Sequence, residues 1–201
     1  MVVTLGRTNV LTGQPGAVPV TLASTLGLTN LTFQLGAPAS QLTGFMLNPL
    51  VAEVTSASLQ PLDSNNYAAS FVLNPALQLG ETRSLASLSF MSLSNLHSAI
   101  VPLSLSAPAG LQDNGQAVLN PTGSGGQVIV IGAEPVLELV PGGILSLYGR
   151  PGAPYTLQTA TSLGPLPPWS NLFSLTLTNS PERFNWTDQG DAFRLFRVSS
   201  P

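Results

Sequence analysis

An alternation of apolar and polar residues with a period of two is the feature that most constrains the fold of this chain. Apolar and polar side chains take turns along residues 18–22, 31–35, 88–90 and 101–105. Side chains of a β-strand point to opposite faces in turn, so each stretch predicts a strand with one face in a core and one toward water. Residues 128–131, Val-Ile-Val-Ile, are apolar on both faces and predict a central strand. No helix of ordinary length is indicated.

Turn-forming residues separate these stretches. The chain holds 19 glycines and 18 prolines, and 43% of its residues are hydrophobic, so short strands joined by turns can still build a core. The triplet 113–115, Asp-Asn-Gly, suits a tight turn because Asn-Gly accepts a positive φ. Weaker strands are expected at residues 2–5, 51–59 and 67–73. Composition and pattern together predict an all-β protein.

A second block of strands begins near Pro135. Both tryptophans, Trp169 and Trp186, fall in this block. The stretch 132–135 is the expected linker, which gives two domains, residues 1–133 and 134–201. About nine strands and then about six predict two β-sandwiches in tandem, the first a jelly roll and the second a small sandwich of the immunoglobulin or fibronectin type. The six strands of the second block are expected at residues 136–140, 144–149, 155–160, 173–177, 183–188 and 194–198.

The charged residues exclude several classes of function. They make up only 7% of a chain with a net charge of −3, no cysteine and one histidine. Enzymes mostly use His, Cys, Lys and close carboxylate pairs for catalysis. We therefore expect that this protein is not an enzyme and has no catalytic, cofactor-binding or metal-binding residues. Six scattered arginines form no basic face for nucleic acid. No run approaches the roughly 20 apolar residues of a membrane span, so no membrane insertion is expected.

Four segments of the first block resemble the cohesin family. The resemblance covers residues 2–133, about two thirds of the chain, and implies a cohesin-like sandwich that binds a protein, either a dockerin or another surface protein. After the second of these strands, family members often carry an aromatic–Asp pair where this chain has Gly36, Ala37 and Pro38. The segments are 16–22 (GAVPVTL), 28–35 (LTNLTFQL), 85–90 (LASLSF), and 101–105 followed by the turn at 113–115 and residues 126–130.

The second block resembles a small C-terminal sandwich that ends large exported proteins of Verrucomicrobia and their relatives. This resemblance implies an exported bacterial protein, extracellular or at the cell surface, in which the block is a structural or anchoring cap. The first residues do not form a signal peptide, so the leader is expected to be absent from this chain. The resemblance rests on residues 149–158, 162–163, 169–172, 184–188 and 194–198.

Polar residues that could carry chemistry have simpler structural explanations. His97 lies in an expected loop and has no nucleophile elbow or oxyanion loop beside it. The nine acidic residues are sparse and lie mostly beside turns, which does not indicate a pair for glycoside hydrolysis. Residues 188–191, Asp-Gln-Gly-Asp, could offer oxygens to calcium, although a plain turn is favoured. Arg150, Arg194 and Arg197 are expected to form structural ion pairs with acids of the second block.

Five aromatic residues of the second block could form a platform for sugar rings. A small domain also needs large side chains to fill its core, which competes with such a role. Trp169 follows two prolines and is the best candidate for an exposed carbohydrate-binding residue. The five residues are Tyr148, Tyr155, Trp169, Trp186 and Phe193.

The sequence therefore predicts a non-enzymatic extracellular or cell-surface module for adhesion or assembly. We expect it to be part of a larger exported bacterial protein and to bind a protein partner through a sheet face. Apolar residues at strand positions that face water would mark that face. Two alternatives stay open, a carbohydrate-binding module and an appendage of an upstream glycoside hydrolase. A polysaccharide is the alternative to a protein partner.

Overall fold

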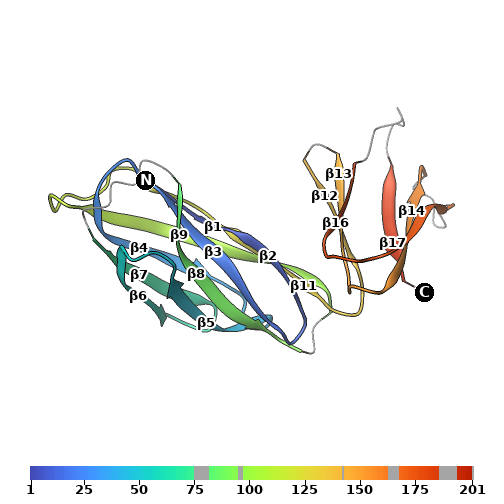
Figure 1. Cartoon of the computed structure of the whole chain (residues 1–201), viewed down its shortest axis with the longest axis horizontal. Coiled ribbons are helices and arrows are strands. Elements are labelled where there is room, and N and C mark those ends of the chain that lie inside the picture. Colours follow the sequence, from blue (N-terminus) through green and yellow to red (C-terminus); the bar gives the residue numbers. More distant parts are fainter. Residues whose placement is uncertain (75–81, 95–96, 142, 163–167, 186–193, 201) are drawn as a thin grey trace. The chain divides into compact units, whose positions relative to one another are not determined.

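The computed structural model describes residues 1–74, 82–94, 97–141, 143–162, 168–185 and 194–200. These residues form seventeen strands and no helix (Figure 1). By its internal contacts the chain divides into a first unit, Met1–Asn95 with Ile100–Ile129, and a second unit, Leu96–Ala99 with Val130–Pro201. The all-β prediction is confirmed. The domain limits 1–133 and 134–201 stay predictions.

The first unit contains a five-stranded sheet in the order β10-β1-β3-β8-β5. All neighbouring pairs are antiparallel except β1 with β10, which run parallel. The edges of this sheet are the three-residue β10 and the bulged β5. The strands are β1 (Val2–Leu5), β3 (Pro15–Ala23), β5 (Leu42–Pro49), β8 (Arg83–Ser92) and β10 (Thr122–Ser124).

The other sheet of the first unit has six strands in the order β2-β11-β9-β4-β7-β6. Strand β4 lies inside this sheet and pairs antiparallel with β7 on one side and β9 on the other. Strand β6 forms one edge and β2 the other. The strands are β2 (Arg7–Leu11), β4 (Leu28–Gly36), β6 (Val54–Pro61), β7 (Asn66–Leu73), β9 (Ala99–Gln112) and β11 (Gly126–Ile131).

Alternation along the strands builds the core between these two sheets. In β4, Leu31, Phe33 and Leu35 are buried, whereas the intervening Thr32 and Gln34 are exposed. Val18, Val20 and Leu22 of β3 are fully buried in the same way from the other sheet. The two sheets meet at ring contacts such as that of Phe45 in β5 with Tyr67 in β7, whose centroids lie 5.3 Å apart. The first unit is therefore a β-sandwich.

The second unit is a smaller sandwich of two three-stranded sheets, β12-β13-β16 and β15-β14-β17. Its core contains Leu147 from one sheet and Tyr155 from the other, packed with Leu177. The rings of Phe173 and Phe184 also meet across the two sheets, with centroids 4.9 Å apart. The strands are β12 (Val136–Val140), β13 (Ile144–Tyr148), β14 (Pro154–Ala160), β15 (Ser170–Thr176), β16 (Glu182–Asn185) and β17 (Leu195–Ser199).

Eleven strands form the first unit, where the alternation predicts about nine. The pattern misses β2, β5 and β10, and for β5 and β10 the structure gives the physical reason. Strand β5 carries a bulge between Thr43 and Met46, and Gly44 within it has a φ of 65°. The extra residues of the bulge break the period of two. Strand β10 is only three residues long and fully exposed, so it has no apolar alternation. The prediction for 128–131 is confirmed, since β11 lies between β2 and β9 with these residues buried.

Candidate functional site

The outward side of β6, β7, β4 and β9 gathers small and uncharged side chains on one surface. On β4 the outward residues are Thr32 and Gln34, and on β7 they are Ser70 and Val72. Register places Thr32 opposite Ser70, and Ser70 in turn opposite Ser58 of β6. We call this surface the β4–β7 face and define it by Asn30, Thr32, Gln34, Ser58, Gln60, Ala68, Ser70, Val72, Ala109 and Leu111.

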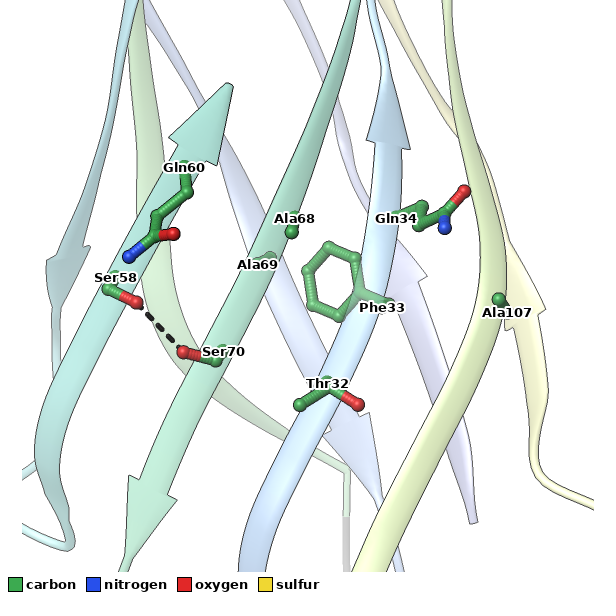
Figure 2. A pocket seen from close by; sticks show the side chains of 9 residues that line it. All are labelled: Thr32, Phe33, Gln34, Ser58, Gln60, Ala68, Ala69, Ser70 and Ala107. Atoms are coloured by element: carbon green, nitrogen blue, oxygen red, sulfur yellow. Dashed lines mark hydrogen bonds between the residues drawn. The ribbon is translucent and has the colours of Figure 1, made fainter. Parts of the chain in front are cut away.

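A first depression on this face has a volume of about 400 Å³. Figure 2 shows Ser58 and Ser70 joined across β6 and β7 by a hydrogen bond, with an Oγ–Oγ distance of 2.8 Å. Gln34 and Gln60 extend from strands on either side of Ala68 (Figure 2). Because the residue between the two amides is an alanine, the surface is low at its middle and bordered by groups that donate and accept hydrogen bonds.

A second depression of about 420 Å³ continues from the first, since Thr32 and Ser70 line both. Its exposed apolar side chains are Val72, 48% accessible, and Leu111, 41% accessible. These are apolar residues at strand positions that face water, the type of residue that we expect to mark a docking surface. The two depressions form one continuous surface over β6, β7, β4 and β9.

An irregularity in β9 shapes this surface. Opposite the step from Thr32 to Gln34, β9 runs from Ala109 to Ser106, so it carries one residue more than β4. At this bulge Ala107 has a φ of 47°, in the left-handed region that residues with a Cβ rarely adopt. Ala107 lines the first depression across from Gln34 (Figure 2). The bulge therefore bends β9 at the border of the face.

The β4–β7 face itself carries no charged residue. Its ten defining residues are all neutral, and the nearest acids along the chain are Asp113, directly after β9, and Asp63, in the turn between β6 and β7. Asp63 Oδ1 accepts hydrogen bonds from the backbone N–H groups of Asn65 and Asn66, at 2.7 and 2.9 Å. The side-chain amide of Asn66, followed by the backbone of Asn65, lowers the pKa of Asp63. This carboxylate is thus engaged in its own turn.

Comparison with solved structures assigns the fold of the first unit. A structure of CaCohA2 in complex with a variant of CaDoc0917 matches with a TM-score of 0.57 at 18% identity, over 64% of this chain and 98% of the other. The seventh ScaB type I cohesin of Pseudobacteroides cellulosolvens matches with a TM-score of 0.54 at 17% identity, over 67% and 94%. The first unit has the cohesin fold.

Another cohesin-like match is the Coh-OlpA–Doc918 complex of Clostridium thermocellum, with a TM-score of 0.55 at 14% identity over 64% of this chain and 96% of the other. No protein-family model and no curated protein matches the sequence. The resemblance stated for the first block is therefore confirmed at the level of fold. The resemblance of the second block to the terminal sandwiches of Verrucomicrobia stays a prediction.

A third depression of about 410 Å³ lies at the end of β4 in the six-stranded sheet. Gly36, Ala37 and Pro38 line it together with Ser104 and Asn65. A Cβ on Gly36 would meet the Oγ of Ser104, so a larger residue at this position would require the Ser104 side chain to rotate.

His97 lines none of the three depressions. Its side chain is 90% accessible, and its Nδ1 lies 2.6 Å from Oε1 of Glu134. The neighbouring Ser98 Oγ accepts from the N–H of Gly132 at 2.7 Å and donates to the backbone carbonyl of Glu134. Ser98 therefore engages backbone groups, and the contacts of His97 agree with the interpretation of a loop histidine.

Two of the five aromatic residues proposed for the sugar platform are buried in the structure. Tyr148 and Tyr155 are buried, with 4% and 3% of their surface accessible, so they belong to the core. The Tyr148 hydroxyl donates to Glu138, and the Tyr155 hydroxyl accepts from the N–H of Arg150. Trp186 and Phe193 lie outside the described residues, as does the stretch 188–191.

Trp169 is half-buried, and its ring contacts a guanidinium. The Cζ of Arg197 lies 4.3 Å from the ring centroid, in the geometry of a cation–π interaction. The Nε of Arg197 donates to Gln158, and that of Arg150 donates to the carbonyl of Gly132. These two arginines thus form specific contacts with uncharged partners.

Among the residues that the structure describes, no group of three or more His, Cys, Asp or Glu side chains could hold a metal ion. No helical segment suited to crossing a bilayer occurs in the same part of the chain.

Sequence reasoning did not single out the β4–β7 face. Thr32, Gln34 and Ser70 are ordinary polar residues of alternating strands, and they come together only because β4 and β7 are neighbours in the sheet. The sequence feature that could have indicated this face is Val72, an apolar residue at an outward position between the core residues Phe71 and Leu73.

Proposed function

We propose that this chain is a non-enzymatic adhesion or assembly module and that a protein partner docks on the β4–β7 face. The observation that carries the proposal is the pair of connected, uncharged depressions on the outward side of the cohesin-like sheet. The complexes CaDoc0917–CaCohA2 and Coh-OlpA–Doc918 are assemblies of that fold with a partner protein. A dockerin or another surface protein is therefore the proposed class of partner.

The chemistry of the face suits a protein with an uncharged docking surface. Desolvation of neutral hydroxyl and amide groups costs much less than desolvation of charges. Ser58 and Ser70 already satisfy one another, while Gln34 and Gln60 can still pair across an interface. Val72 and Leu111 offer apolar area for burial. Because the face has no charge, we expect binding that depends weakly on salt.

The cellular setting belongs to the same proposal. We propose an extracellular or cell-surface location within a larger exported bacterial protein, with the second unit as a terminal cap like those of Verrucomicrobia and relatives. The appendage of an upstream glycoside hydrolase stays an alternative, in which docking on the β4–β7 face would join the chain to other components.

Titration calorimetry with a panel of purified dockerin modules, Doc918 included, tests the docking surface. We expect one or more modules to bind the wild-type chain. Ser70→Arg places a long charged side chain in the middle of the face and should weaken binding at least about tenfold, because a charge would be buried without a partner. The matched control is Ser87→Arg on β8, the same change on the other sheet, which should bind like the wild type.

Two results would contradict this proposal. Equal binding by the wild type, Ser70→Arg and Ser87→Arg would remove the β4–β7 face as the docking surface. Failure of every dockerin to bind a folded wild-type chain would remove dockerins as the partner class. Circular dichroism of each variant verifies that it is folded.

A further inference from the structure

The second unit carries a connected row of polar side chains on the outward side of the sheet β15-β14-β17. Tyr155 and Leu157 of β14 point into the core, whereas Thr156 and Gln158 alternate with them and point outward. Register places Gln158 between Asn171 of β15 and Arg197 of β17. We call Trp169, Asn171, Gln158 and Arg197 the Arg197 row.

Each residue of the Arg197 row contacts another residue of the row through a stacking interaction or a hydrogen bond. The ring of Trp169 lies beneath the guanidinium of Arg197, with 4.3 Å from Cζ to the ring centroid. Arg197 Nε donates to Gln158 Oε1 at 2.7 Å, and Gln158 Nε2 donates to Asn171 Oδ1 at 2.7 Å. Stacking and the Nε bond together restrain the guanidinium plane, so its orientation is set before any ligand arrives.

Among the residues that the structure describes, none contacts the two terminal nitrogens of the restrained guanidinium. Arg197 is exposed, and its contacts with described residues use its Nε and the face of its plane. A planar guanidinium with a free edge matches a carboxylate, which it can bind through two parallel hydrogen bonds. Asn171 is exposed as well, and its amide N–H₂ can donate to a neighbouring hydroxyl.

The charge around the row is favourable to an anion. The three strands Pro154–Ala160, Ser170–Thr176 and Leu195–Ser199 contain one arginine and no acidic residue. A second row beside the first, Thr156 with Ser174, adds hydroxyls joined at 2.8 Å. The described surface of this sheet therefore combines one oriented cation with amides and hydroxyls that both donate and accept.

We propose that the Arg197 row binds a polysaccharide that carries carboxylate groups, with Arg197 on the carboxylate and Asn171 and Gln158 on ring hydroxyls. Neutral groups that both donate and accept suit the hydroxyls of a sugar, whereas an acidic peptide offers mainly acceptors along its side chains. In this arrangement Trp169 positions Arg197, since the guanidinium covers its ring. The inference concerns the second unit and does not rest on the proposed function.

Affinity electrophoresis of the full chain in gels that contain polygalacturonate, neutral dextran or poly-L-glutamate tests this site. We expect polygalacturonate alone to retard the wild type. The protein has a net charge of −3, so a polyanion repels it and nonspecific retention in such a gel is unfavourable. Arg197→Gln should weaken the retardation about tenfold or more, the scale of one charge-assisted hydrogen-bond pair. Asn171→Ala should weaken it to a smaller extent.

The matched control is Arg83→Gln, which removes one positive charge from the first unit. It should be retarded like the wild type. Equal loss in Arg83→Gln and Arg197→Gln would overturn the site in favour of unspecific charge attraction. Retardation by dextran that survives Arg197→Gln, or equal retardation by poly-L-glutamate, would overturn the carboxylated polysaccharide as the ligand, as would no retardation in any gel. Circular dichroism verifies that each variant is folded. The Asn171→Ala variant, which keeps Arg197, provides a second and milder change of the same site.

Discussion

Single residues show how an exposed contact can still be specific. Glu134 accepts from His97 at 2.6 Å and from the N–H of Ser98 at 3.3 Å, although more than half of its side chain is accessible. The hydrogen bond of His97, followed by backbone hydrogen bonds, lowers the pKa of the Glu134 carboxyl. The histidine that the sequence offers as a catalytic candidate thus lies in a small polar cluster.

The pKa of Glu134 provides a prediction at this scale. We expect the Glu134 carboxyl to titrate at a lower pH in the wild type than in His97→Ala, because the variant loses the largest cause of the shift. A carbon-detected NMR titration measures both midpoints. Since the folded-state pKa is lowered, the contact stabilises the fold above the ordinary pKa of glutamate and is lost as pH falls through the folded value. Identical midpoints in the two proteins would contradict this.

At the scale of elements, turn chemistry and bulges decide where the strands of the candidate face end and bend. The β6–β7 turn closes through backbone bonds from the N–H groups of Leu62 and Asp63 to the carbonyl of Asn66, at 2.8 and 3.2 Å. Asp63 reinforces it by accepting from the backbone N–H groups of Asn65 and Asn66, the pattern of an Asx turn. This hairpin positions Ser58 against Ser70.

Asp63→Ala should lower the thermal midpoint of the first unit, because two backbone N–H groups lose their acceptor. The loss should be larger at neutral pH than in acid. The lowered pKa means that the wild-type carboxylate stabilises the turn above its ordinary range and stops doing so as pH falls through the folded value. Thermal scans over a pH series measure this. Asp63→Asn, which keeps the Oδ1 acceptor, should retain most of the midpoint, and an equal drop in both variants would refute the role of the acceptor.

At the scale of the whole molecule, each unit has its own core. Phe71 is 1% accessible and stacks on Phe33 in the first unit, with centroids 6.0 Å apart. The second unit has a separate cluster around Leu147 and Tyr155. Both tryptophans belong to the second unit, so tryptophan fluorescence follows that unit alone.

Phe71→Ala should lower the free energy of unfolding of the first unit by about 3–5 kcal/mol, since it leaves a cavity in a closed core. Val72→Ala, the outward neighbour on the same strand, should cost about 0.5 kcal/mol or less. Urea titrations followed by circular dichroism measure the shift, while the fluorescence transition should stay in place. A fluorescence transition that moves with Phe71→Ala would mean that the two units unfold together.

The local pattern of the sequence determined the class of the fold and most of the strands. Alternation is a local property, and it predicts β1 and β12 with the same limits that the structure has. The continuous apolar run 128–131 likewise identifies β11, a strand buried on both faces. It could not find β5, whose bulge shifts the period, or β10, whose three residues pair with β1 from far away in the chain. Such strands exist because a neighbour supplies their hydrogen bonds.

The candidate sites were decided by the tertiary structure, because each joins residues from strands that are distant in sequence. Thr32, Ser58 and Ser70 become one surface only through the order of the six-stranded sheet. Trp169 could be singled out as a residue, but its partner Arg197 is 28 positions further along and reaches it through the pairing of β14 with β17. By itself the sequence determined which side chains face water, since that depends on alternation along one strand. Which of them become neighbours depends on strand order, and that is set by the packing of the whole chain.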